Sequence, residues 1–142
     1  ILLFITFGSG IIFVLYQLRQ FRPKYKLISQ PTDLAQLDLT RRRWEGIMSR
    51  LESGLEADWR LAIIEADSLV DDVFKRIGLQ GESLGERIQS ISPMEFRFLS
   101  DLRQAHQLRN QLVHTPGYKI SRQEAENTLR KYQKILEELE VI

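Results

Sequence analysis

The residues best suited to acid–base chemistry are gathered in one segment of the chain. The only two histidines, His106 and His114, lie there together with Arg103, Arg109 and Asn110. Imidazole titrates close to neutral pH and can give or take a proton, and a guanidinium group binds phosphate oxygens through paired N–H donors. This cluster is therefore the first candidate for chemistry on a phosphate-containing substrate.

Arg109 occupies an unusual place in the apolar pattern of this segment. The spacing predicts a helix from about residue 94 to residue 113, followed by Pro116 and Gly117. At about 100° per residue, Arg109 falls inside its broad apolar arc, whereas Arg103, Asn110 and His114 line the edge. An arginine in such a position needs an acid, another subunit or an anionic ligand as its partner. The commoner arrangement is a structural ion pair, for which the preceding long helix offers Glu65, Asp67 and Asp72.

The segments after residue 37 have the apolar spacing of helices, and no alternating β-branched run occurs. The predicted helices span about residues 38–53, 55–77, 84–91 and 94–113, and a last helix begins after residue 121. The first should bury Leu39, Trp44, Ile47, Met48 and Leu51, and the last should bury Ala125, Leu129, Tyr132, Leu136 and Leu139. Four or five helices with short connections predict an all-α bundle over residues 38–142.

The helix boundaries carry recognisable signals. Gly54 and Gly78 follow two of the predicted helices, where glycine commonly ends a helix. Ser121 and Glu124 have the spacing of a capping box. The sequence GESLGERI, residues 81–88, has neither the lysine nor the strand of a nucleotide-binding loop, and we expect a turn that leads into a short helix.

The N-terminal segment predicts a membrane anchor. Residues 1–18 carry no charge and, at about 1.5 Å per residue, nearly span a bilayer core of about 30 Å. The basic sequence RQFRPKYK follows in place of a signal-peptide cleavage site. We therefore expect a transmembrane helix over residues 1–22, a juxtamembrane linker over residues 23–37, and the helical domain on the cytoplasmic side of a bacterial inner membrane.

Composition excludes several classes of site. The chain has no cysteine, so disulfides, thiolate catalysis and cysteine-based metal sites are excluded. The first 37 residues carry four of the 20 basic residues and one of the 19 acidic residues, so the remainder has a net charge of −2. Capture of nucleic acid by a diffuse positive field is therefore not expected. Asp71 and Asp72 are adjacent on a helix and point about 100° apart, so we predict no metal and no cofactor.

The sequence RNQLVH, Arg109 to His114, resembles the signature of the HEPN family of helical-bundle proteins: an arginine, a polar residue that is often asparagine, and a histidine a few residues later. Its position near the end of a long helix, before the last helix of a bundle, is also similar. GESLGERI and AHQLRN further resemble a membrane-anchored HEPN-like group of bacteria. The resemblance covers residues 55–142.

In catalytic members of that family, the resemblance implies a metal-independent ribonuclease built across a homodimer. Arg109 and His114 would be the catalytic pair, and Asn110 would orient the histidine or the phosphate. Arg103 and His106 are accessory candidates, although a histidine in the place of His106 is more often a hydrogen-bonded residue at the edge of the core. The position two residues after the histidine, a tyrosine in some family toxins, is Pro116 here.

The sequence alone therefore does not decide between two functions. One is an endoribonuclease that acts on RNA as a homodimer tethered to the bilayer through residues 1–22. The other is a non-catalytic helical module that binds a protein partner at the cytoplasmic face of the membrane, with Arg109 as a structural charge.

Overall fold

The computed structural model describes the backbone of residues 31–142 and the side chains of residues 34–142. All regular secondary structure in this range is helical. The elements are α2 (Pro31–Ser49), the 3₁₀ turn η1 (Arg50–Ser53), α3 (Glu56–Arg76), α4 (Leu84–Ser90), α5 (Leu99–His114) and α6 (Arg122–Glu138). The predicted all-α fold is thus confirmed for residues 31–142.

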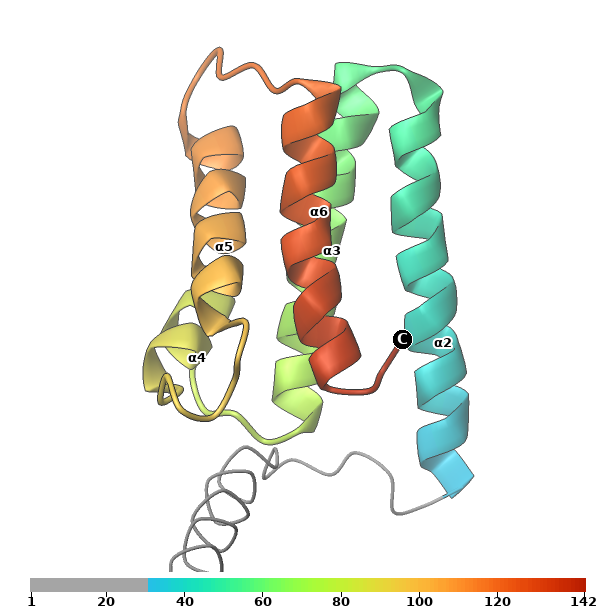
Figure 1. The fold of residues 1–142 in the computed structure, drawn as a ribbon, viewed down its shortest axis with the longest axis vertical. Helices are drawn as coiled ribbons and strands as arrows, with labels where there is room; N and C mark the ends of the chain where they lie inside the picture. Colours follow the sequence, from blue (N-terminus) through green and yellow to red (C-terminus); the bar gives the residue numbers. More distant parts are fainter. Residues whose placement is uncertain (1–30) are drawn as a thin grey trace, which may run out of the picture.

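The four long helices lie side by side and the short α4 sits at one end of α5 (Figure 1). Helix α3 is the central element, because it packs against α2, η1, α4, α5 and α6. Helix α6 covers α3 and also packs along α5. A side chain on the face of α3 that meets α5 therefore lies between these two helices, and α6 covers it.

The core forms where α3 and α6 meet. Their apolar residues recur at helical spacing, so each helix buries one continuous face. All five side chains that the sequence assigned to the buried face of α6 are buried: Ala125, Leu129, Tyr132, Leu136 and Leu139. The burial of these side chains is the main stabilising contribution, since each removes apolar surface from water.

The predicted helix ends are also found. Gly54 and Gly78 have φ angles of +72° and +85°, a left-handed conformation that glycine adopts without steric cost. Ser121 accepts a hydrogen bond from the backbone N–H of Glu124 at 3.1 Å, which caps α6. The Glu124 carboxylate accepts from the Tyr118 hydroxyl at 2.9 Å, so the cap is tied to the preceding loop.

Two predicted boundaries and one core residue were wrong. Helix α2 begins at Pro31, so the predicted linker over residues 23–37 extends too far; proline suits a first helical turn because it has no N–H to leave unpaired. Helix α5 begins at Leu99 and not near residue 94. Leu39 is 52% exposed because its side of α2 meets no other helix closely.

The late start of α5 has a tertiary cause. The Glu138 carboxylate, at the end of α6, accepts hydrogen bonds from the backbone N–H groups of Arg97 (2.7 Å) and Phe98 (3.2 Å). Phe98 is the N-cap of α5, so its N–H is one that the helix cannot satisfy itself, and Arg97 directly precedes it. A residue 40 positions away thus fixes where α5 begins.

The predicted transmembrane helix, residues 1–22, and the first part of the predicted linker lie outside the described residues. Between Pro31 and Ile142 no helix is both long and apolar enough to cross a bilayer.

We expect Leu129→Ala, a fully buried change on α6, to lower the free energy of unfolding by about 2–5 kcal/mol, because it removes buried methyl groups and leaves a cavity. Leu39→Ala is the matched control on an exposed position and should change it by less than about 0.5 kcal/mol. Urea unfolding followed by circular dichroism measures both. An equal loss in the two variants would contradict the packing of α2 described above.

Candidate functional site

The buried carboxylate of Asp67 is the centre of the polar cluster. It lies on the buried side of α3 and is only 4% exposed. The His106 Nδ1 atom and the Tyr132 hydroxyl lie 2.7 Å and 2.8 Å from its Oδ1 atom, and the Arg109 Nε atom lies 3.4 Å from its Oδ2 atom. A buried carboxylate is costly unless such partners surround it. Both of its oxygen atoms are therefore engaged.

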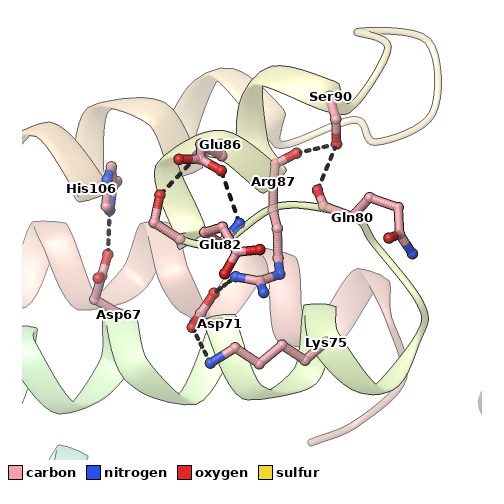
Figure 2. A network of polar contacts seen from close by, with 10 residues as sticks. Asp67, Asp71, Lys75, Gln80, Glu82, Glu86, Arg87, Ser90 and His106 are labelled. Atoms are coloured by element: carbon pink, nitrogen blue, oxygen red, sulfur yellow. Dashed lines mark hydrogen bonds and ion pairs between the residues drawn. The ribbon is translucent and has the colours of Figure 1, made fainter.

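Three helices bring these groups together. His106 and Arg109 are three residues apart on α5, so their side chains share one face of the helix, and that face meets Asp67 on α3. Tyr132 comes from the central stripe of α6 and closes the cluster from the third side. Figure 2 shows His106 standing over Asp67 with its ring nitrogen directed at the carboxylate.

Of the three acids that could pair with Arg109, the structure selects Asp67. Glu65 instead accepts two hydrogen bonds from Arg50, and Asp72 accepts one from Arg43. Arg50 belongs to η1 and Arg43 to α2, so both of those acids pair with the segment that precedes α3. The position of each acid around α3 thus decides its partner.

The Arg109 guanidinium is held along one edge and open along another. Its Nε atom is sealed from solvent, faces Asp67 and makes no well-aligned hydrogen bond. Its Nη1 atom donates to the Asn110 side-chain oxygen at 3.0 Å. The remaining Nη2 atom has no partner in the described part of the chain and is not sealed from solvent, and the side chain as a whole is 30% exposed. Asn110 therefore orients the arginine.

His114 is exposed in the last turn of α5 and makes no hydrogen bond or ion pair within residues 31–142. Five residues separate it from Arg109, which is about 140° around the helix. The structure of one chain thus brings Arg109 together with Asn110 and His106, and it leaves His114 and the exposed Arg103 outside the cluster.

The end of α5 that carries His114 is fixed by Arg60 of α3. The Arg60 guanidinium donates to the carbonyl oxygen of Leu112 at 2.6 Å and to that of Tyr118 in the loop before α6. Carbonyl groups at a helix C-terminus have no partner within the helix, so a cation there is favourable. Arg60 therefore sets the position of His114 although it does not contact it.

Helix α4 forms a cover over His106. Its predicted turn and helix start are confirmed, since Ser83 accepts from the backbone N–H of Glu86 at 3.3 Å. Buried Arg87 donates to Asp71 on α3 at 2.6 Å and thereby docks α4 (Figure 2). Gly85 lies against the His106 ring, because a Cβ atom built on it would be 3.2 Å from the Nε2 atom.

The sequence carries a second sign of this cluster besides Arg109. Asp67 lies inside the apolar arc of its helix, between Ala66 and Val70, just as Arg109 lies inside that of α5. Two opposite charges on apolar arcs of neighbouring helices favour an ion pair. Tyr132 was predicted only as a core residue, and no pattern in the sequence indicated that its hydroxyl would join the carboxylate.

Burial raises the pKa of Tyr132 well above that of an ordinary tyrosine. The negative charge of Asp67 and the hydrogen bond to it act in the same direction, whereas Arg109 opposes them.

Over residues 34–142, the side chains gather no group of three histidine or acidic residues suited to holding a metal ion.

Comparison of the chain with family models, with curated proteins and with solved structures found no match.

We expect stability to fall at high pH through Tyr132. Because its pKa is raised in the folded state, its contribution to stability is complete below the pKa of an unfolded tyrosine, about 10, and is lost as the pH rises above it. Tyr132→Phe should cost about 1.5–3 kcal/mol at pH 7, because the lost hydrogen bond is to a charged group, and it should flatten this alkaline loss. Urea unfolding between pH 7 and pH 11 measures both effects.

Tyr118→Phe is the control for that experiment, because Tyr118 is half-buried and its pKa is raised mainly by its hydrogen bond to Glu124. It should leave most of the alkaline loss in place. If the free energy of unfolding is the same for wild type and Tyr132→Phe from pH 7 to pH 11, the phenol–carboxylate contact contributes nothing to stability.

Proposed function

We propose that this chain is a membrane-tethered HEPN-like protein whose helical domain acts as a homodimeric, metal-independent endoribonuclease. One observation carries the proposal: Arg109 is anchored by a buried carboxylate and by Asn110 yet keeps an accessible edge. A guanidinium oriented in advance can bind a phosphoryl group with little loss of side-chain entropy. The sequence motif that includes His114 supports the same function.

The chemistry would proceed at one phosphodiester of RNA. An imidazole takes the proton from the 2′-hydroxyl, the 2′-oxygen attacks the phosphorus atom, and the bond to the 5′-oxygen breaks as that oxygen receives a proton. The products are a 2′,3′-cyclic phosphate and a free 5′-hydroxyl. Arg109 would stabilise the charge that builds on the phosphoryl oxygens, and His114 would transfer a proton.

The geometry of one chain gives the reason to propose a dimer. Arg109 and His114 point to different sides of α5, so one chain does not present both to the same phosphate. A two-fold axis beside α5 would place the arginine of one chain near the histidine of the other. Leu61 on α3 is 39% exposed and Val113 on α5 is 48% exposed, and both offer apolar surface for such a contact.

A second candidate function has its own support. The ion pair between Arg109 and Asp67 within one chain accounts for the charge of the arginine without any substrate. The domain would then be a non-catalytic module that binds a protein partner at the cytoplasmic membrane face. Both proposals share the anchor, which rests on the composition of residues 1–22.

The test is RNA cleavage by the full chain in detergent with EDTA present throughout. We expect wild type to leave 2′,3′-cyclic phosphate ends and His114→Ala and Arg109→Ala each to lower the rate by about 10²–10⁴-fold. Arg41→Ala, an exposed charge on α2, is the control. Intact RNA after incubation with a folded wild-type dimer would contradict the ribonuclease and favour the interaction module.

Subunit mixing tests whether the site is shared. If each site takes an arginine and a histidine from different chains, dimers that combine one Arg109→Ala chain with one His114→Ala chain should recover part of the activity that both pure variants lack. Activity is measured after the two proteins are exchanged and the mixed dimer is isolated with two different tags. No recovery in a mixed dimer of confirmed composition would exclude a site that takes its arginine from one chain and its histidine from the other.

A further inference from the structure

Two side chains on one face of α5 contact the same buried carboxylate, and each keeps one nitrogen atom that has no partner in the described region and is not sealed from solvent. His106 is held through Nδ1 and Arg109 through Nε. From this arrangement we infer that His106 and Arg109 of a single chain form a binding site for a phosphate group. The inference shares Arg109 with the proposed ribonuclease, but it needs neither RNA cleavage nor a second chain.

The free nitrogen of His106 has defined chemistry. The Asp67 carboxylate accepts hydrogen bonds, so the proton of a neutral His106 ring is on Nδ1 and the Nε2 atom carries the lone pair. Nε2 has no partner in the described region and is not among its sealed polar atoms, which are those of Trp59, Arg87 and Arg109. When it carries a proton, this nitrogen would donate to an oxyanion.

Arg109 supplies the permanent charge of this site. Asp67 and Asn110 hold the guanidinium along Nε and Nη1, which leaves Nη2 as the accessible donor. Because the two residues are three positions apart on α5, their Cβ atoms are about 5–6 Å apart. A tetrahedral phosphate, with oxygen atoms on several sides, can accept from both groups at once.

The charges of Asp67 and Arg109 offset each other, so a bound anion needs a proton on Nε2 as its compensating positive charge. The His106 ring meets Asp67 of α3, and the same carboxylate also engages Arg109 of α5 and the phenol of Tyr132 of α6. Helix α4 contributes Gly85, and the carboxylate of its Glu86 is engaged by the backbone N–H of Glu82. Binding of phosphate and protonation of Nε2 should each favour the other, because the bound anion stabilises the imidazolium.

Gly85 gives the inference a second test, at a residue that is not itself part of the Asp67 cluster. A methyl group at this position would lie 3.2 Å from Nε2, closer than ordinary contact, and would occupy space beside the free nitrogen. Gly85→Ala also raises helix propensity within α4, so the fold should tolerate it. Because this contact is tight, the ring or α4 has to shift by a few tenths of an ångström, so the free energy of unfolding of the variant is measured beside its phosphate binding. A phosphate site at Nε2 predicts weaker binding at unchanged stability, whereas a purely structural effect lowers stability.

The experiment uses the full chain with ¹⁵N-labelled histidine. Since the chain has only two histidines, His114→Ala leaves His106 as the only imidazole signal. We expect sodium phosphate, added at constant ionic strength against a chloride reference, to move the His106 Nε2 resonance from the lone-pair to the protonated position in a saturable manner. Arg109→Gln should weaken this apparent affinity about tenfold, Gly85→Ala should weaken it, and Arg41→Gln should leave it unchanged.

A 2′-deoxy dinucleotide, which has no 2′-hydroxyl and is not cleaved, distinguishes the source of the phosphate group. Tighter binding than inorganic phosphate assigns the site to a phosphodiester, and weaker binding assigns it to a small phosphate. A His106 signal that neither ligand moves, in protein whose helical circular dichroism is intact, overturns the inference. If Arg109→Gln does not fold, Gly85→Ala alone decides.

The two proposals can fail separately. A phosphate-dependent His106 signal without RNA cleavage would leave the single-chain site in place and remove the ribonuclease. Cleavage that depends on His114, with no effect of phosphate on His106, would do the reverse.

Discussion

A carboxylate buried where three helices meet has to be compensated within the protein, and much of the described domain is organised around that requirement at Asp67. An imidazole and a guanidinium from α5 and a phenol from α6 converge on its two oxygen atoms. Removing one partner of a buried charged group is far more costly than the net value of the contact. The cluster therefore restricts how α5 and α6 can be placed around α3, in addition to the non-directional packing of the core.

The same cluster links the fold to the chemistry that we propose. Asp67 is too deeply buried to meet a ligand, but it fixes which nitrogen of His106 and which edge of Arg109 remain open. The contact between Arg87 and Asp71 docks α4 next to the His106 ring. Access to this ring therefore depends on Gly85, which has no side chain and lies against it. Residues without contact to solvent thus determine what the exposed atoms of the site can do.

Predictions from the sequence were accurate where the residues of a single helix determine which side chains are buried and where the helix ends. The stripe on α6 and the caps at Ser121 and Gly78 are local patterns, and they were confirmed. The predictions were poor where a distant residue determines the structure. Helix α5 starts at Leu99 because the Glu138 carboxylate accepts from the backbone N–H groups of the two residues before it, and nothing near residue 97 indicates this. The charge of Arg109 was recognised, but only the rotation of α3 could select its partner among three acids.

His106 and His114 show why residue type alone could not rank the members of the candidate site. Both are histidines on α5, yet the 80° or so by which eight residues rotate around a helix places one against Asp67 and the other in solvent. The ring that the protein orients is His106, whereas the sequence motif points to His114. An oriented donor suits binding in one chain, and an exposed histidine at a helix end suits a site completed by a second chain. Arg109 lies between the two rings along α5, so one arginine could serve a phosphate held within a chain and a phosphate shared across a dimer, although not both at the same time.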